Sequence, residues 1–288
     1  MAERADFFLG VDAGASRCKL RIRDAAGALV AEREAGPASP YAEGEKGFAT
    51  LDAVIARGLA IADIGEDTLP FVSAGIASAG VSREEPARGF SAWRSPFGKT
   101  RFEVDIYAAW LGASGGEDGA VVSVGTGTAA LAVRQGRRHF LSGYGFRLYD
   151  LGSAAWVGRR VLQGTLAAAD GTRPPSGLTK RLMERFDGNP EQIALWAASA
   201  TPAEFGGFAP WAVEAAARKD GVALTALCEA AADVDALIDR AQELGGGRVS
   251  LVGGFAGPLM PYLERRNRLS PAKADALEGA VMIARGEG

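Results

Sequence analysis

Reactive side chains are scarce in this sequence. Its 288 residues include two cysteines and one histidine. Cys18 and Cys228 lie far apart and lack the spacing of metal ligands, so neither a zinc site nor a disulfide framework is expected, and a reducing cytoplasm is the simplest compartment. His139 alone excludes mechanisms that need a histidine pair or a histidine-rich metal site. Its place beside a polar turn favours a surface position.

Long apolar runs and an excess of one charge are also missing. No run is long enough to span a membrane and no signal peptide is recognisable, so we expect a cytoplasmic protein without membrane insertion. The net charge is -3 and no basic run occurs, which argues against nucleic acid as a partner. With 48% hydrophobic and 23% charged residues, the chain is typical of a globular protein, and its length fits two domains better than one.

Glycine is abundant, and two glycine-rich turns each follow a short apolar strand-like segment. The first turn, Asp12–Ser16, follows Phe7–Val11, and the second, Gly125–Thr128, follows AVVSV. Glycines allow backbone N–H groups to approach an anion, and threonine hydroxyls add donors. Both turns lead into another strand, whereas a dinucleotide-binding or Walker-type loop leads into a helix. We therefore predict phosphate sites on β-hairpins, and neither a Rossmann fold nor a P-loop.

The two turns belong to an internal repeat. AVVSV–GTGT–AALAV–RQGR–RHF matches FFLGV–DAGAS–RCKLRIR–DAAG–ALVAE as strand, glycine-rich turn, strand, turn and strand. Such a repeat predicts two similar domains that face each other across a cleft and hold a polyphosphate from both sides. Further along, the alanine-rich segment Pro210–Leu244 is predicted to be strongly helical, and the last helix is predicted over Pro271–Arg285.

Asp105 is a candidate general base. A predicted strand, Phe102–Asp105, ends there, and a helix begins at Ile106. A carboxylate in this place can accept a proton from a bound hydroxyl, and an ordinary aspartate pKa of about 4 suffices because that proton becomes acidic late in phosphoryl transfer. The same residue can serve as a helix N-cap.

Five segments in order resemble the N-acetylglucosamine kinase and BadF/BadG/BcrA/BcrD ATPase family, part of the superfamily of actin, sugar kinases and heat-shock-70 ATPases. GVDAGASRCKLRIRD and VSVGTGTAALAV are similar to the family's two phosphate motifs, and GYGFRLYDLGSAAWVGRRVL to its glycine-rich signature. LVGGFA resembles the adenosine motif and Leu277–Ala280 the closing helix. The resemblance implies an α/β fold of two ribonuclease-H-like (actin-like ATPase) domains with a cleft between them, over residues 1–113 and 114–270, with the last helix (271–286) packing on the first domain.

The resemblance also implies a reaction, in which ATP with Mg²⁺ phosphorylates the 6-hydroxyl of an amino sugar, N-acetylglucosamine or glucosamine. Asp105 aligns with the general base, and Asp12 would hold Mg²⁺ through water. The residues implied in ATP or phosphate binding are Asp12, Gly14, Ala15, Ser16, Arg17, Gly125, Thr126, Gly127, Thr128, Gly253, Gly254 and Phe255. Those implied in sugar binding are Ser39, Asp105, Thr126, Gly143, Tyr144 and Asp150. A homodimer is implied as well.

Four residues depart from the family pattern. Ser39 replaces an Asn, Tyr144 a Trp, Tyr149 a Gly and Leu151 a Glu. All four lie near the expected acceptor site and none near the expected ATP site, so ATP binding is better determined by the sequence than the identity of the sugar.

Structural interpretations and other functions stay open at this point. Asp12 and Asp150 can cap a turn or helix, the two glycine turns can be ordinary hairpins, and Ser39 can be a plain loop residue. The chain can also be an ATPase activator of a reductase, although such proteins bridge an iron–sulfur cluster with cysteines, and Cys18 in a strand and Cys228 in a helix form no visible pair. A non-catalytic sugar sensor is the third alternative.

Overall fold

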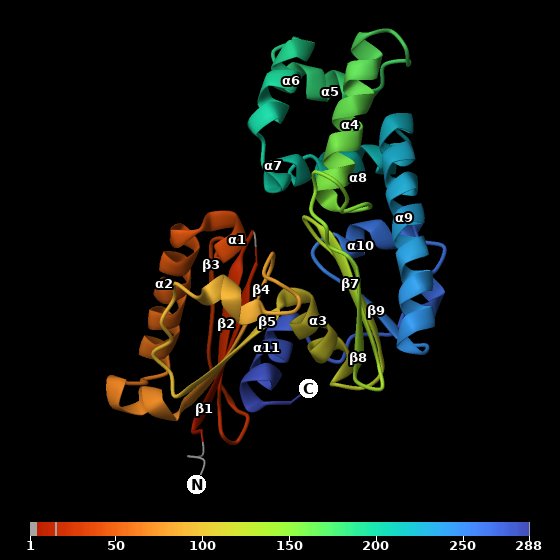
Figure 1. The fold of residues 1–288 in the computed structure, drawn as a ribbon. Coiled ribbons are helices and arrows are strands. Elements are labelled where there is room, and N and C mark those ends of the chain that lie inside the picture. The colour runs from red at the N-terminus through yellow and green to blue at the C-terminus, as the bar shows by residue number, and fades with distance from the viewer. Residues whose placement is uncertain (1–4, 15, 288) are drawn as a thin grey trace. The chain divides into compact units, whose positions relative to one another are not determined.

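A computed structural model describes residues 5–14 and 16–287, which form two compact units (Figure 1). The first unit runs through Val121 and resumes at Pro271, and the second comprises Val122–Ser270. The family resemblance implied a boundary after residue 113, whereas the first unit here ends at Val121, within a strand of the second sheet. No helix among the described residues is long and apolar enough to cross a membrane.

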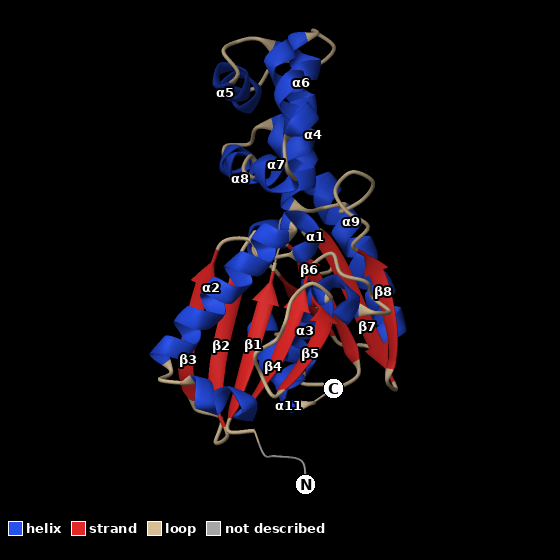
Figure 2. Cartoon of the chain, turned by 60° about the vertical axis from the view of Figure 1, so that its left-hand side comes forward, coloured by secondary structure: helices blue, strands red, loops and turns tan. Residues whose placement is uncertain are grey.

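The first unit is built on a five-stranded sheet with the order β3-β2-β1-β4-β5 (Figure 2). Strand β1 pairs antiparallel with β2 and parallel with β4, and β4 pairs parallel with β5. Its elements are β1 (Phe7–Ala13), β2 (Cys18–Asp24), β3 (Leu29–Ala35), α1 (Pro40–Glu43), α2 (Glu45–Ile61), β4 (Val72–Ser78), β5 (Lys99–Val104), α3 (Asp105–Ser114) and α11 (Ala276–Arg285).

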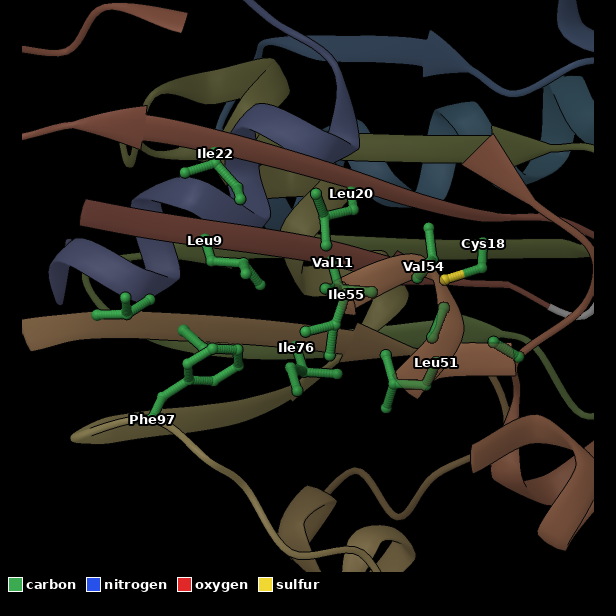
Figure 3. Packing of buried hydrophobic residues seen from close by; sticks show 14 of the residues in the cluster. Leu9, Val11, Cys18, Leu20, Ile22, Leu51, Val54, Ile55, Ile76 and Phe97 are labelled. Atoms are coloured by element: carbon green, nitrogen blue, oxygen red, sulfur yellow. The ribbon is translucent and has the colours of Figure 1, made fainter. Parts of the chain in front are cut away.

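One face of this sheet forms the core with α2. Side chains alternate between the two faces of a strand, so every second residue of β1 and β2 points into this core. Figure 3 shows the packing of these residues, which include Leu9, Val11, Cys18, Leu20, Ile22, Leu51, Val54, Ile55 and Ile76. Along β2, Cys18, Leu20 and Ile22 are buried and alternate with the more exposed Lys19, Arg21 and Arg23, as the apolar–polar alternation of this sequence segment predicts for a half-buried strand.

The other face of the sheet carries α11. Gly10 of β1 and Gly75 of β4 lie directly beneath this helix: a Cβ atom on Gly10 would lie 2.6 Å from the backbone nitrogen of Val281, and one on Gly75 would overlap the carbonyl of Ala280. Glycine is required at both positions because any side chain would push the helix away. Since Gly10 and Asp12 are two residues apart on β1, Asp12 shares this face with α11.

Charged residues fasten α11 to β2. Arg21 donates to both Asp275 and Glu278, and Arg23 donates to Glu278 as well. Asp275 also caps the helix by accepting from the backbone N–H of Glu278 at 2.8 Å. The helix therefore begins at Ala276, five residues after the predicted start at Pro271, because Asp275 is the N-cap residue.

The second unit is built on a four-stranded sheet with the order β8-β7-β6-β9, in which β7 pairs antiparallel with β8. This order repeats β3-β2-β1-β4 of the first unit, as the sequence repeat suggests. The elements are β6 (Gly119–Val124), β7 (Thr128–Arg134), β8 (Arg137–Ser142), α4 (Ala154–Ala169), α5 (Gly177–Arg185), α6 (Pro190–Ser199), α7 (Pro202–Gly206), α8 (Ala209–Ala217), α9 (Gly221–Gly245), β9 (Val249–Val252) and α10 (Ala256–Leu259).

The segment Pro210–Leu244 is helical as predicted, and it consists of two helices. Helix α8 ends at Ala217, and Asp220 caps α9 by accepting from the backbone N–H groups of Val222 and Ala223. His139 lies on β8 and is half-buried, so part of it is exposed beside the polar turn.

Candidate active site

Two carboxylates of the first unit lie within electrostatic reach of each other. Asp12 belongs to β1, where it pairs with Lys19 of β2 and Ala77 of β4, so the strand extends past Val11, where the sequence placed its end. Asp105 is the first residue of α3, and its Oδ1 accepts a 2.8 Å hydrogen bond from the backbone N–H of Ile106. Asp105 therefore does stabilise the start of a helix, while the N-cap position itself is taken by Val104.

Burial changes the acidity of both groups. Burial, as the larger cause, and the negative charge of Asp105 together raise the pKa of Asp12 to about 7, against the opposing charge of Lys19. Burial also raises the pKa of Asp105, while hydrogen bonds from its own amide and that of Ile106, and the charge of Arg83, act in the other direction. The expected ordinary aspartate pKa near 4 is therefore wrong for the candidate base.

The pair fits a hard divalent cation. Carboxylate oxygens are the protein ligands that Mg²⁺ prefers, and a cation beside Asp12 would offset the repulsion between Asp12 and Asp105. No group of three or more His, Cys, Asp or Glu residues gathers as a metal site within residues 5–14 and 16–287. Mg²⁺ usually keeps several waters and binds substrate phosphates, so one or two carboxylates can be the only protein ligands that it needs.

The turn after β1 is closed by its own backbone. The N–H of Gly14 donates to the carbonyl of Arg17 at 2.9 Å, and a Cβ atom on Gly14 would lie 2.8 Å from that carbonyl oxygen. Ser16 and Arg17 are exposed, and Arg17 forms a 3.5 Å ion pair with Glu34. Ala15, the remaining residue implied in phosphate binding here, lies outside the described residues.

Ser39 is buried beside this turn, with 1% of its surface exposed. Its hydroxyl donates to the carbonyl of Ala79 at 2.8 Å, and the neighbouring Ala38 N–H donates to the carbonyl of Gly14 at 3.3 Å. The hydroxyl therefore connects the loop before α1 to the segment after β4.

The turn after β6 is held by α4. The carbonyls of Gly125 and Thr126 accept hydrogen bonds from the N–H groups of Ala154 and Ala155, at 2.9 and 3.3 Å. Ser153 caps the same helix, since its side chain accepts from the N–H of Trp156. Because two carbonyls of the turn are bound to the helix, they do not repel an anion at the turn. Sequence reasoning missed Ser153, although a serine directly before a helical pattern is the usual signal of an N-cap.

Thr128 carries a buried hydroxyl with no hydrogen-bond partner in the part of the chain that the structure describes. Its backbone carbonyl, in contrast, accepts from both the N–H of Gly143 and the hydroxyl of Ser142, each at 2.9 Å. An unpaired buried hydroxyl costs about 1–3 kcal/mol, so a ligand oxygen that accepts from it would be stabilising.

Asp150 lies against this turn. A Cβ atom on Gly127 would lie only 2.6 Å from Oδ2 of Asp150, so glycine is needed there to admit the carboxylate. Asp150 is buried and has a φ of 53°, a left-handed conformation that aspartate tolerates better than most residues. Tyr144, in contrast, is 62% exposed on the loop that precedes Asp150.

The third glycine motif meets the same strand end. The N–H of Phe255 donates to the carbonyl of Val124 at 2.9 Å, and Gly253 has a φ of 102° that favours glycine. Gly253 and Gly254 are exposed, while the Phe255 side chain is only 6% exposed. The Phe255 ring therefore packs inside the unit, while its backbone N–H fixes the turn.

Known proteins share this arrangement over the whole chain. The chain is 30% identical over 281 residues to glucosamine kinase GspK of Vibrio cholerae, with 97% of this chain and 96% of that protein covered. A candidate N-acetylglucosamine kinase from Chromobacterium violaceum superposes with a TM-score of 0.89 at 28% identity, covering 97% and 99% of the two chains.

A protein of lower sequence identity has the same fold. A ROK family glucokinase from Streptomyces griseus, in complex with glucose and AMPPNP, matches with a TM-score of 0.58 at 20% identity, covering 97% of this chain and 99% of that one. The expected fold of two actin-like ATPase domains is thereby confirmed. The model of the BadF/BadG/BcrA/BcrD ATPase family matches residues 9–284, a range that contains both glycine turns and the motif at Gly253. The chain belongs to the BadF/BadG/BcrA/BcrD ATPase family.

Proposed function

We propose that this protein is an ATP-dependent amino-sugar kinase that phosphorylates the 6-hydroxyl of N-acetylglucosamine or glucosamine. The observation that carries the proposal is the pair of Asp12 and Asp105, two carboxylates with raised pKa values on one unit. The similarity of the chain to a glucosamine kinase, over nearly the full length of the chain, supports the same reaction class. Phosphoryl transfer needs positioning, charge neutralisation and a base for the acceptor hydroxyl, and this pair can provide the last two.

Asp105 is proposed as the general base. A base whose pKa is raised takes up a proton more readily, provided that the carboxylate is ionised when the acceptor arrives. Hydrogen bonds from the N–H groups at the start of α3 and the charge of Arg83 favour that ionised form. Asp12 would hold Mg²⁺ through water, and the bound ion would neutralise charge on the ATP phosphates.

The two glycine turns are proposed to bind the phosphates of ATP, through residues Gly14–Arg17 and Gly125–Thr128. The buried hydroxyl of Thr128 supports this role because a phosphate oxygen would give it an acceptor. Gly253 and Gly254 are exposed beside the second turn and are proposed to contact adenosine through their backbone.

The acceptor is proposed to contact Ser39, Asp105, Thr126, Gly143, Tyr144 and Asp150. Asp150 supports the assignment because its carboxylate lies beside the phosphate turn and can accept hydrogen bonds from sugar hydroxyls. The hydroxyl of Ser39 already donates to Ala79, so its contribution to the sugar would be through its remaining lone pairs.

The test is coupled ADP release with Mg-ATP against N-acetylglucosamine, glucosamine, N-acetylmannosamine, N-acetylmuramic acid, glucose and no sugar. Strong release with one amino sugar and little without sugar is the expected result, and it names the acceptor. Equal release in every well would point to an ATPase that lacks its partner, and no release at all would contradict the kinase assignment. The oligomeric state, proposed as a homodimer, is measured on the same sample by analytical ultracentrifugation.

No described feature favours the reductase activator. Cys18 is fully buried in the core of the first unit, and burial raises the pKa of its thiol to about 12. A thiol in that state is a poor source of the thiolate that an iron–sulfur cluster needs.

A further inference from the structure

Arg159 on α4 is a half-buried cation that no ion pair within residues 5–14 and 16–287 accounts for. Burial lowers the pKa of its guanidinium, and the neighbouring charge of Arg160 lowers it further. Arg160, one residue along the same helix, is paired with Glu229 at 2.6 Å. A partly buried charge without an ion pair is costly, so the position of Arg159 needs an explanation that the paired Arg160 does not.

Outside its helix, Arg159 contacts Phe146. Its guanidinium lies 4.9 Å from the centre of the Phe146 ring, and its Nη1 donates to the Phe146 carbonyl at 3.4 Å. The same ring packs on Phe205 of α7, with the ring centres 4.9 Å apart. Phe146 is thus held by a cation–π contact, a long hydrogen bond and a neighbouring aromatic ring.

Phe146 is the midpoint of the loop Gly143–Tyr149, which we name the acceptor loop. Its other large side chains point to solvent: Tyr144, Leu148 and Tyr149 are 62%, 85% and 41% exposed. The rings of Tyr144 and Tyr149 meet edge to face at 5.7 Å. Phe146 is therefore the apolar side chain that fastens the loop to the body of the unit.

Both ends of the acceptor loop adjoin the phosphate turn. Gly143 donates to the carbonyl of Thr128, and Asp150, which follows the loop, lies against Gly127. Helix α4 holds the same turn through Ala154 and Ala155, about one helical turn before Arg159. Helix α4 therefore supports the phosphate turn through its first two residues and the acceptor loop through Arg159, one helical turn later.

We propose, resting on the kinase function above, that Arg159 is a positioning residue that fixes the acceptor loop and thereby presents Tyr144, Tyr149 and Asp150 to the amino sugar. Exposed aromatic rings beside a carboxylate suit a sugar, because the rings pack on its C–H face and the carboxylate accepts from its hydroxyls. Arg159 itself touches neither substrate in this proposal.

The kinetic test compares Arg159→Met with Arg159→Lys and with the matched control Arg160→Met. Arg159→Met is expected to raise the KM for the amino sugar about tenfold and to change the KM for ATP less than about twofold, because the loop loosens while the turn stays bound to α4. Arg159→Lys keeps the charge over the ring and is expected to fall between Arg159→Met and the wild type. Equal changes in both KM values, or equal effects of Arg159→Met and Arg160→Met, would overturn the proposal.

Hydrogen exchange tests the same proposal without any activity. The N–H groups of Leu148 and Tyr149 both donate to the carbonyl of Gly145 and report on the order of the acceptor loop. Arg159→Met is expected to speed their exchange and to leave that of Ala154 and Ala155 unchanged. If the wild type phosphorylates no sugar, the proposed function is wrong. The exchange measurement still shows whether Arg159 orders the acceptor loop. Unchanged exchange in the loop would overturn the inference even in an active kinase.

Discussion

The turns after β1 and β6 occupy equivalent places in two similar sheets, yet they differ in what surrounds them. The first has a carboxylate, Asp12, in the strand before it and a second, Asp105, in electrostatic reach. The second contains no acid, has two carbonyls bound to α4 and keeps the hydroxyl of Thr128 buried and unpaired. The two copies of the hairpin thus differ in that the first has acidic side chains in and beside its leading strand, while the second has an unpaired buried hydroxyl.

The helices that follow β5 and β8 also differ in their first residues. In the first unit, α3 starts with Asp105 itself, so an acid occupies the start of the helix. In the second, Ser153 caps α4 and leaves the first N–H groups of the helix to bind the turn. The repeated hairpin places the turn, and the neighbouring helix decides whether that turn serves charge or backbone recognition.

The largest expected effect follows from replacing the proposed base in the first unit. Asp105→Asn should lower kcat about 1,000-fold, because an amide cannot take the acceptor proton. The amide oxygen can still accept from Ile106, so the helix start and ATP affinity should be preserved, as nucleotide titration would show. Asp150→Asn is the matched variant in the second unit. A greater loss of kcat in Asp150→Asn than in Asp105→Asn would reverse the proposed division between the two units.

Asp12 should show a conflict between activity and stability. Asp12→Asn should lower kcat/KM about 100-fold by removing the charge that holds the cation. The folded-state pKa of about 7 lies above the ordinary value of 3.8, so the folded protein keeps a proton that the unfolded chain has lost. The wild type, without nucleotide or metal, should therefore lose stability as the pH rises from about 4 to 7.

Urea unfolding at pH 5 and pH 8 measures this contribution. The free energy of unfolding of Asp12→Asn should change less between the two pH values than that of the wild type, and the variant should be the more stable protein at pH 8. Identical pH dependence in the two proteins would show that Asp12 does not carry the raised pKa.

Adding one methyl group to the second turn should have a smaller effect. Gly127→Ala places a Cβ atom 2.6 Å from Asp150 and should lower kcat/KM about tenfold by displacing that carboxylate. Gly125→Ala is the control, because its Cβ atom would lie 4.0 Å from its nearest neighbour, the nitrogen of Gly254. Steady-state kinetics of both variants gives the comparison, and a greater loss in Gly125→Ala would contradict the proposed role of Asp150.

The smallest effect is expected at Ser39. Ser39→Ala removes the hydrogen bond to Ala79 and should lower the free energy of unfolding by about 1 kcal/mol, measured by urea titration. The KM for the amino sugar should rise only about twofold, because the hydroxyl offers the proposed acceptor no more than its remaining lone pairs. A tenfold rise in that KM with unchanged stability would show that the hydroxyl serves the sugar more than the loop.

Local patterns in the sequence determined much of the fold. Alternation along Cys18–Arg23 predicted which side chains enter the core, and the repeated strand–turn–strand pattern predicted two related sheets. These features follow from strand periodicity and glycine conformation, which depend on neighbouring residues. The break at Asp220 and the start of α11 at Asp275 were missed, although both carry the acidic N-cap that could have located them.

Only the tertiary structure decided the acidity and environment of the candidate site. Asp12 and Asp105 are 93 positions apart in the sequence. Burial raises the pKa of both, and the charge of Asp105 also raises that of Asp12. Three further features are likewise non-local: the contact of Asp150 with Gly127, the burial of Phe255, and the cation–π contact of Arg159 with Phe146. Burial and charge interactions depend on distances in space, and the local order of residues does not contain those distances. Strand alternation and turn chemistry depend on neighbouring residues, so the sequence alone could predict them.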